Sequence, residues 1–199
     1  MDPQKRDELT TEALRIVLAE FAEKARLGLL AFTLFTKNDY EINWHHAALC
    51  KKLDDFARGK IKRLIVSMPP RHGKSELVSR RLPAFILGIN PNAQIIAASY
   101  GADLAARMNR DVQRIMESAH YAELFPKSTL NETNLKLPGQ ASPTRTSDLF
   151  EITNHAGIYR SAGVGGAITG MGCNFGIIDD PIKNQEEADS QVYRDKVWD

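Results

Sequence analysis

The sequence is poor in cysteine, with only Cys50 and Cys173 among its 199 residues. The two cysteines stand alone and lack the spacing of a disulfide framework or of a zinc site. The five histidines do not fall at metal-ligand spacing either. These absences argue against a disulfide scaffold and a zinc protein, and they predict a reduced, intracellular protein.

An excess charge of one sign and a long apolar run are also missing. The 26 lysines and arginines offset 25 acidic residues, so no overall basic field argues for nucleic-acid binding. The most apolar run, residues 27–35, is too short to span a bilayer, and residues 1–12 lack the basic start of a signal peptide. We therefore expect a cytoplasmic protein without membrane contact.

The sequence does contain a loop with the features of a phosphate site. Residues 64–76 read Leu-Ile-Val-Ser-Met-Pro-Pro-Arg-His-Gly-Lys-Ser-Glu, and they predict a strand at about 61–66, a loop, and a helix over 77–87. This order is typical of a P-loop, in which backbone N–H groups and a helix N-terminus face a phosphate. Lys74 is predicted to reach the β- and γ-phosphates, and Ser75 to bind Mg²⁺.

The loop departs from the usual motif at its beginning. Met68 stands where the motif begins with glycine, and Pro69 and Pro70 stiffen the loop. Gly-Lys-Ser is a common tripeptide, so a helix start that needs no ligand is the alternative interpretation. The apolar segments on both sides favour the phosphate site, because a motif counts only in its structural context.

A second motif lies over a hundred residues downstream, in Asn-Phe-Gly-Ile-Ile-Asp-Asp-Pro at positions 174–181. An apolar strand ends there in two acids, and Pro181 ends the strand because it lacks a backbone donor. As a Walker B strand, it predicts that Asp179 binds Mg²⁺ and that Asp180 orients or deprotonates the attacking water. The alternative is a plain turn after a core strand. Many ATPases with a P-loop and a Walker B strand carry glutamate at the position of Asp180. The side chain of Asp180 is one methylene shorter than that glutamate.

Hydrophobic spacing and turn signals predict helices at about 7–30, 43–59, 102–117 and 185–198, a strand at 94–99, and a hairpin with strands at 149–153 and 158–161. The alternation of strands and helices predicts an α/β fold with a mostly parallel sheet. The first helix carries an apolar stripe that we expect to pack against the rest of the protein, formed by Leu14, Val17, Leu18, Phe21 and Ala25. The glycine-rich stretch 163–172 is either a mobile active-site loop or a plain connector.

Several segments together resemble the N-terminal ATPase domain of the large terminase subunit of tailed bacteriophages. They are Trp44-His45, Met68-Pro-Pro-Arg-His-Gly-Lys-Ser-Glu76, Ala98-Ser-Tyr-Gly101, Tyr121-Ala-Glu-Leu-Phe-Pro126, Val164-Gly-Gly-Ala-Ile-Thr-Gly170 and Ile177-Ile-Asp-Asp-Pro-Ile-Lys-Asn184. The resemblance covers about residues 20–199. It implies a P-loop NTPase with an additional-strand, RecA-like fold, preceded by an N-terminal helical segment at 1–42, so that the ATPase domain is expected at 43–199.

The same resemblance implies roles for individual residues. It makes Lys74 and Asp180 catalytic, assigns Mg²⁺ to Ser75 and Asp179, and assigns the nucleotide phosphates to Arg71, His72, Gly73, Lys74, Ser75 and Glu76. Trp44 and His45 correspond to the region that holds adenine, although Trp44 reads equally well as a core aromatic. An arginine is expected to stabilise the transition state, and Arg71 and Arg160 are the candidates.

The family also implies partners. Such a motor hydrolyses ATP with Mg²⁺ to drive double-stranded DNA through the portal protein into a procapsid, with a small terminase subunit and a homo-oligomeric ring, in the host cytoplasm. The chain ends at Asp199, before the family's coupling motif and its C-terminal nuclease domain, so we expect an incomplete ATPase domain without nuclease activity. Two alternatives remain: another RecA-like DNA motor of the helicase type, or an inactive nucleotide-binding remnant that acts as an assembly module.

Overall fold

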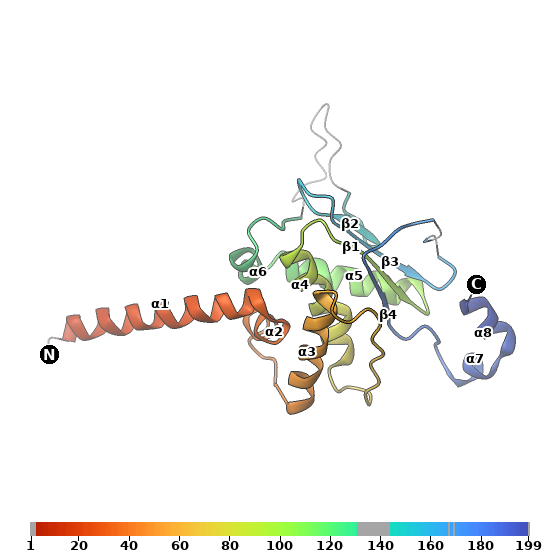
Figure 1. Ribbon diagram of the computed structural model, residues 1–199, viewed down its shortest axis with the longest axis horizontal. Helices are drawn as coiled ribbons and strands as arrows, with labels where there is room; N and C mark the ends of the chain where they lie inside the picture. The colour runs from red at the N-terminus through yellow and green to blue at the C-terminus, as the bar shows by residue number, and fades with distance from the viewer. Residues whose placement is uncertain (1–2, 131–143, 167, 169, 199) are drawn as a thin grey trace, which may run out of the picture. The chain divides into compact units, whose positions relative to one another are not determined.

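The structure is a computed structural model that describes residues 3–130, 144–166, 168 and 170–198 (Figure 1). The chain divides into two compact units between Leu64 and Ile65. This division in packing lies later in the chain than the domain boundary expected after residue 42, and that boundary stays a prediction. Within the described part of the chain, no helix is both long and apolar enough to cross a membrane.

The first unit contains the helices α1 (Pro3–Leu27), α2 (Leu29–Thr36) and α3 (Trp44–Ala57). The prediction of one helix over 7–30 is therefore wrong at its end. Gly28 is extended, with φ −152° and ψ 138°, and it separates α1 from α2. The backbone N–H of Leu29 donates to Asp54 Oδ1 of α3 at 2.9 Å, which supplies a partner to one of the donors that a helix start leaves unsatisfied.

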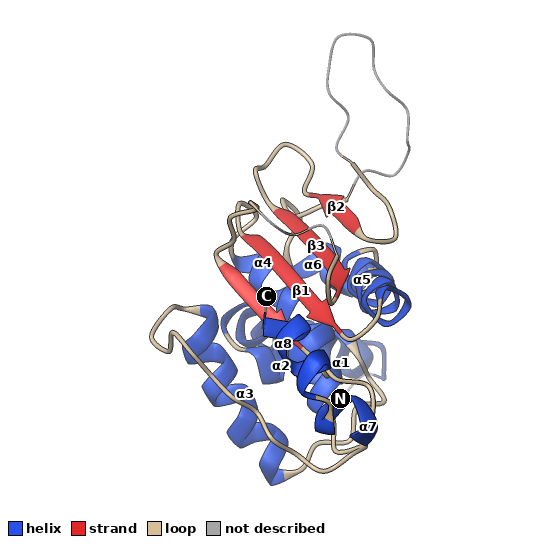
Figure 2. Cartoon of the chain, turned by 90° about the vertical axis from the view of Figure 1, so that its right-hand side faces the viewer, coloured by secondary structure: helices blue, strands red, loops and turns tan. Residues whose placement is uncertain are grey.

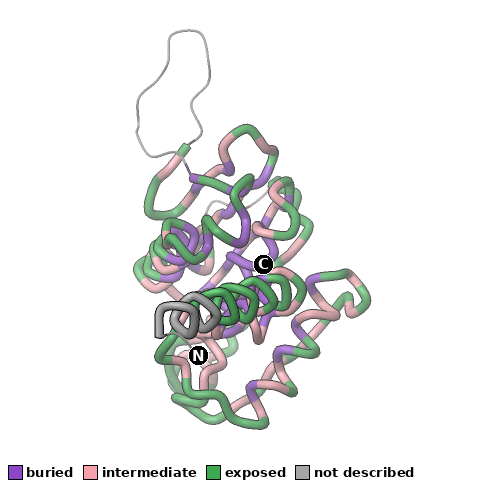
Figure 3. Tube along the Cα trace, turned by 90° about the vertical axis from the view of Figure 1, so that its left-hand side faces the viewer, coloured by how far each residue is buried: buried purple, intermediate pink, exposed green. Residues whose placement is uncertain are grey.

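The apolar stripe of α1 is buried only near the C-terminal end of the helix. Ala25 is fully buried, and the rings of Phe21 and Phe35 lie 5.4 Å apart. Three members of the stripe are exposed: Leu14 by 58%, Val17 by 60% and Leu18 by 50%. Figure 3 shows this exposed stretch of α1 in green. The expectation that the whole stripe packs is thus wrong for these three, because no described residue covers that part of α1.

The helix predicted at 43–59 forms as α3 and has a well-defined start and end. The N–H of Trp44 donates to Asn43 Oδ1 at 2.7 Å, and the N–H of Asn43 donates to His46 Nδ1 at 3.0 Å. This reciprocal arrangement is a capping box. Gly59, just after α3, has φ +71°, a left-handed conformation that favours glycine and ends the helix.

The second unit contains a sheet with helices around it. Its elements are the π-helical turn η1 (Glu76–Arg81), α4 (Leu82–Ile89), β1 (Gln94–Ser99), α5 (Ala102–Met116), α6 (Ala119–Leu124), β2 (Leu149–Glu151), β3 (Ile158–Gly163), β4 (Phe175–Ile178), α7 (Gln185–Asp189) and α8 (Gln191–Trp198). The strand order is β2-β3-β1-β4, and Figure 2 shows β2, β3 and β1 side by side. β1 is parallel to β3 and β4, whereas β2 is antiparallel to β3. The α/β class, the strand at 94–99 and the hairpin are confirmed, in a sheet that is mixed.

The core of this unit lies between the sheet and its helices. Alternate residues of β1 are buried, as are all residues of α4 up to Leu87. The rings of Phe150 and Tyr159 stack at 5.2 Å across the hairpin. The predicted helix over 185–198 is wrong as a single element, because Ser190 is extended (φ −76°, ψ 116°) and separates α7 from α8.

The strand predicted at about 61–66 is wrong. Residues 61–69 have no regular secondary structure, and Ile65 is 96% exposed. An apolar, β-branched segment favours an extended backbone, but a strand also needs a neighbour to pair with. Among the described strands β4 pairs with β1 alone, so residues 61–66 are not part of the sheet.

Candidate active site

The two acids of the second motif lie where the parallel strands end. The pairing of β4 with β1 continues past Ile178, since the N–H of Asp179 donates to Ala98 O at 2.9 Å and the N–H of Tyr100 donates to Asp180 O at 3.0 Å. Asp180 adopts a left-handed backbone with φ +49°. The two carboxylates differ in surroundings: the Asp179 side chain is 5% exposed and that of Asp180 is 56% exposed.

The loop before η1 bends through two left-handed residues. Arg71 has φ +63° and Gly73 has φ +85°. The ring of His72 lies back on the loop, with Nδ1 2.8 Å from Pro70 O. The helical segment starts at Lys74, and its early backbone bond runs from Leu77 N to Gly73 O at 3.0 Å. Lys74 and Ser75 therefore lie in the first turn of a helix, where backbone donors have no intrahelical partner.

Lys74 joins this loop to both acids. Its Nζ lies 3.0 Å from Asp179 Oδ1 and 2.8 Å from Asp180 Oδ1. Burial lowers the pKa of Lys74. The hydrogen bonds to Asp180 and Asp179 and the negative charges of these residues outweigh burial, so the pKa lies above its ordinary value. The lysine is fully charged near neutral pH and is held between two carboxylates.

Asp179 is also bound from a second direction. The buried Ser79 of η1 donates its hydroxyl to Asp179 Oδ2 at 2.6 Å. Burial raises the pKa of Asp179, but the hydrogen bonds from Ser79, Lys74 and Ser75 and the charge of Lys74 outweigh burial, so the pKa lies below its ordinary value. Asp179 is therefore ionised at neutral pH although it is almost completely buried.

Glu76, predicted among the nucleotide-binding residues, is engaged by the arginines that follow it. Arg81 Nε donates to Glu76 Oε1 at 2.8 Å, and Arg80 Nη1 lies 3.4 Å from Oε2. Arg80 also donates to Asp111 of α5 at 2.8 Å. These contacts hold η1 against α5 and give Glu76 a structural role within the second unit.

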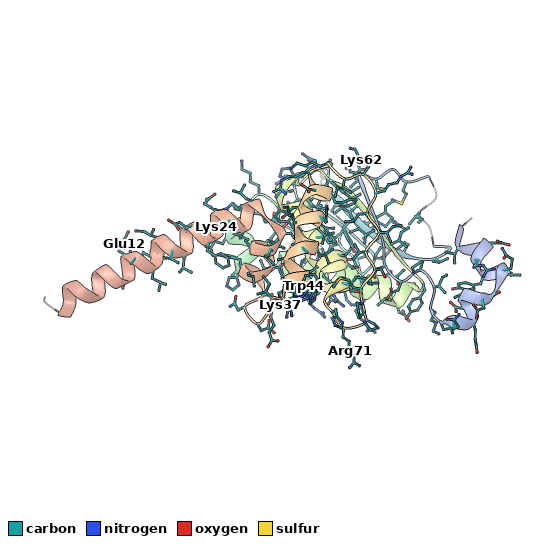
Figure 4. The ribbon with its side chains drawn as sticks, turned by 60° about the horizontal axis from the view of Figure 1, so that its bottom comes forward. Glu12, Lys24, Lys37, Trp44, Lys62 and Arg71 are labelled. Atoms are coloured by element: carbon teal, nitrogen blue, oxygen red, sulfur yellow. The ribbon has the colours of Figure 1, made fainter. Side chains whose placement is uncertain are left out.

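The two candidate arginines lie in different settings. Arg71 is exposed in the loop, and its side chain points away from the ribbon (Figure 4). Arg160 lies inside β3, in register with Ile96 of β1 and Leu149 of β2. Its Nε is buried without a hydrogen-bond partner among the described residues. The structure thus puts Arg71 on the loop of Lys74 and keeps Arg160 away from the strand end.

Trp44 and His45 belong to the first unit. Trp44 is 79% exposed, and its ring is nearly perpendicular to that of His45, with the ring centroids 5.7 Å apart. The interpretation of Trp44 as a core aromatic is therefore wrong. A role for these two residues in holding adenine stays a prediction.

The structure brings together Lys74, Ser75, Asp179 and Asp180, and it adds Ser79, which sequence reasoning did not assign to the site. Ser79 lies at helical spacing from Leu82, Phe85 and Ile86, so the sequence pattern places it on the apolar face of a helix. A hydroxyl on a buried face needs a hydrogen-bond partner, and that requirement is the signal that points to it.

The fold and the site define an α/β domain whose lysine and acids gather at the carboxyl ends of parallel strands, the edge at which such sheets bind ligands. Residues 65–199 match the N-terminal domain of the T4likevirus-type large terminase subunit, and the chain belongs to this family. Membership associates the chain with phage DNA packaging. No curated protein and no solved structure matches the chain.

Proposed function

We propose that this chain is the ATPase domain of a viral DNA-packaging motor, with an additional-strand, RecA-like P-loop fold, and that it hydrolyses ATP with Mg²⁺ to move double-stranded DNA into a procapsid. The observation that carries the proposal is the contact of Lys74 with Asp179 and Asp180 at 3.0 and 2.8 Å. It joins the two halves of a nucleotide site that are separated by over a hundred residues in the sequence.

Phosphate binding rests on the loop and on the helix start. Lys74 already binds two carboxylate oxygens, and a phosphate offers it the same kind of charge-assisted hydrogen bond. The left-handed Gly73 turns the loop toward the first helical turn, whose unsatisfied N–H groups and dipole favour an anion. Lys74 would exchange its carboxylate partners for the β- and γ-phosphates, with His72 and Arg71 on the same loop.

The residues present suit a magnesium ion. Ser75 and Asp179 offer a hydroxyl and an ionised carboxylate, and Mg²⁺ prefers such oxygen ligands together with phosphate oxygens. When bound, Mg²⁺ would neutralise charge that develops on the phosphates during transfer. Asp179 suits this place because it is ionised and fixed on a strand end.

Asp180 is the proposed catalytic carboxylate. Its side chain is 56% exposed, and its one side-chain partner among the described residues is Lys74, so it becomes available once Lys74 turns to phosphate. An available carboxylate beside the nucleotide can orient the attacking water and accept its proton. Asp179, which Ser79 also binds, lacks this freedom.

Arg71 is the better supported of the two candidate arginines. It lies three residues before Lys74 in the loop, is exposed, and can turn toward a transferring phosphoryl group. Arg160 is held in the middle of β3 with its Nε buried. The exposed ring of Trp44, with His45 at its side, is proposed as the surface on which adenine stacks.

Family membership supports a proposal about partners. We propose that the working motor is a homo-oligomeric ring that acts on double-stranded DNA together with a portal protein and a small terminase subunit, in the cytoplasm of the bacterial host. Nucleotide binding without turnover, as an assembly module, is the second candidate. It is favoured by one observation, because the segment before the loop is not paired into the sheet.

The deciding experiment compares Lys74→Ala with Lys127→Ala, an exposed lysine of the same unit. Nucleotide binding is measured by calorimetry, and phosphate release is measured with and without Mg²⁺. Lys74→Ala should lower hydrolysis by about 100-fold or more, because it removes a cation from the phosphates. Circular dichroism should show a retained fold, since Asp179 keeps its bond from Ser79.

The outcomes separate the candidates. Hydrolysis that Lys74→Ala abolishes and Lys127→Ala preserves supports the ATPase. Binding that needs Lys74 but leads to no turnover at any protein concentration supports the assembly module. If Lys74→Ala binds and hydrolyses ATP like the unaltered chain, the nucleotide site lies elsewhere.

A further inference from the structure

We propose that Ser79 is a positioning residue of the magnesium site: its buried hydroxyl holds Asp179 Oδ2, so that Oδ1 stays turned toward Lys74 and the bound nucleotide. The inference rests on the proposed ATPase function and adds to it a residue outside the loop and the strand end.

The two oxygens of Asp179 have different partners. Oδ2 accepts the Ser79 hydroxyl at 2.6 Å, and Oδ1 lies 3.0 Å from Lys74 Nζ. Ser79 is 1% exposed and Asp179 is 4% exposed, so water does not replace the hydroxyl readily. A short hydrogen bond to a charged acceptor in a buried place is among the stronger ones in proteins.

The backbone of η1 fixes where the hydroxyl points. Ser79 lies in a π-helical turn, a deformation that is common at functional sites. An ion pair between Glu76 and Arg81, at 2.8 Å, joins the two ends of the turn. Arg80 binds Asp111 of α5 at 2.8 Å. Because these ion pairs hold the turn, Ser79 keeps its direction when the loop rearranges.

Ser79 and Ser75 bind the same carboxylate but differ in their proposed roles. Both serines donate to Asp179, and they are four residues apart on one helical segment. Ser75 leaves Asp179 if it becomes a metal ligand, and Lys74 leaves it for phosphate. Ser79 is then the remaining side-chain donor to Asp179 among those described, and it prevents rotation of the carboxylate.

Partners that orient a metal ligand change metal affinity by about 10- to 100-fold when they are removed. Ser79→Ala should therefore raise the Mg²⁺ concentration for half-maximal binding of an ATP analogue by about 10- to 100-fold. Binding of the same analogue without metal should stay unchanged, because the hydroxyl of Ser79 donates to Asp179.

The experiment titrates Mg²⁺ into the full chain with a fluorescent, non-hydrolysable ATP analogue. Ser79→Cys is a second variant of nearly equal size whose thiol is a poor donor. Ser128→Ala is the matched control, because Ser128 is also 1% exposed but its hydroxyl bonds Leu87 O at 2.9 Å, away from the acids.

An increased Mg²⁺ requirement in both Ser79 variants, with the Ser128→Ala control unchanged, supports the proposal. An unchanged requirement in either folded Ser79 variant overturns it, as does an equal loss of binding without metal. If the unaltered chain does not bind the analogue, or if Lys74→Ala binds it equally well, the ATPase proposal itself fails and this inference fails with it.

Discussion

Asp179 and Asp180 are adjacent in sequence but differ in exposure and partners, so their substitutions should have different effects. Asp179→Asn should raise the Mg²⁺ requirement, because it removes the charge from the proposed ligand. Asp180→Asn should leave nucleotide binding intact and slow turnover by about 100- to 10,000-fold, the usual contribution of a general base. Calorimetry and phosphate release over a magnesium series measure both effects.

Fold retention in these variants is checked by thermal melting. Asparagine tolerates the left-handed backbone that residue 180 adopts, so Asp180→Asn should melt close to the unaltered chain. Normal turnover of Asp180→Asn in an active preparation would contradict the assignment of the general base.

The sequence predicted the charged residues that the structure brings together, and it did not predict the hydroxyl of Ser79 beside them. Lys74 and Asp179 stand out because each belongs to a recognisable motif, and the two motifs together favour a nucleotide site over a plain helix start or turn. Ser79 has an ordinary explanation in every buried helix, and its partner lies a hundred residues away. A contact over that separation depends on how β4 and η1 pack, which local pattern does not encode.

The end of β3 lies directly against the start of α5. A Cβ atom added at Gly163 would lie 2.6 Å from the backbone N of Ala102 and 2.9 Å from the backbone C of Gly101. Gly163→Ala should therefore destabilise the second unit by about 1–3 kcal/mol, because backbone atoms must move. Urea unfolding measures the loss.

Gly172→Ala is the matched control, since a Cβ there would meet no atom within 4 Å. We expect its unfolding midpoint to stay near that of the unaltered chain. Equal shifts in the two variants would mean that β3 and α5 are not as close as the structure shows.

Elements with strong local signals were predicted closely, and those that depend on distant neighbours were not. β1 agrees with the sequence because the turn signal Asn90-Pro91-Asn92 precedes it, and α5 agrees because its apolar residues recur at helical spacing. Residues 61–66 have the composition of a strand but lack a paired neighbour. The long first helix ends early because Gly28 is extended, at the place where Asp54 of α3 caps α2.

On the scale of the whole molecule, assembly should control activity. In the proposed ring, a neighbouring subunit can complete or order the site, and conformational steps of that kind limit the turnover of many enzymes. We expect the isolated chain to be largely monomeric and a poor ATPase, with turnover per chain that rises with protein concentration.

Phosphate release per chain, measured over a wide concentration range and beside light scattering, tests this expectation. Mixing Lys74→Ala with Arg71→Ala or with Arg160→Ala shows whether either arginine acts on a neighbour, because only such a residue restores turnover in a mixture. A strong rate that does not depend on concentration, with no restoration on mixing, would reject action across a subunit boundary.

The left-handed backbone at residue 180 also explains its side chain. Aspartate and asparagine occur in this conformation several times more often than other residues with a Cβ, so φ +49° favours the shorter acid over glutamate. The turn that exposes this carboxylate therefore restricts which amino acids can provide it. Asp180→Glu would extend the reach of the acid by one methylene while straining the turn. A longer acid at this position therefore requires a change in the backbone that presents it.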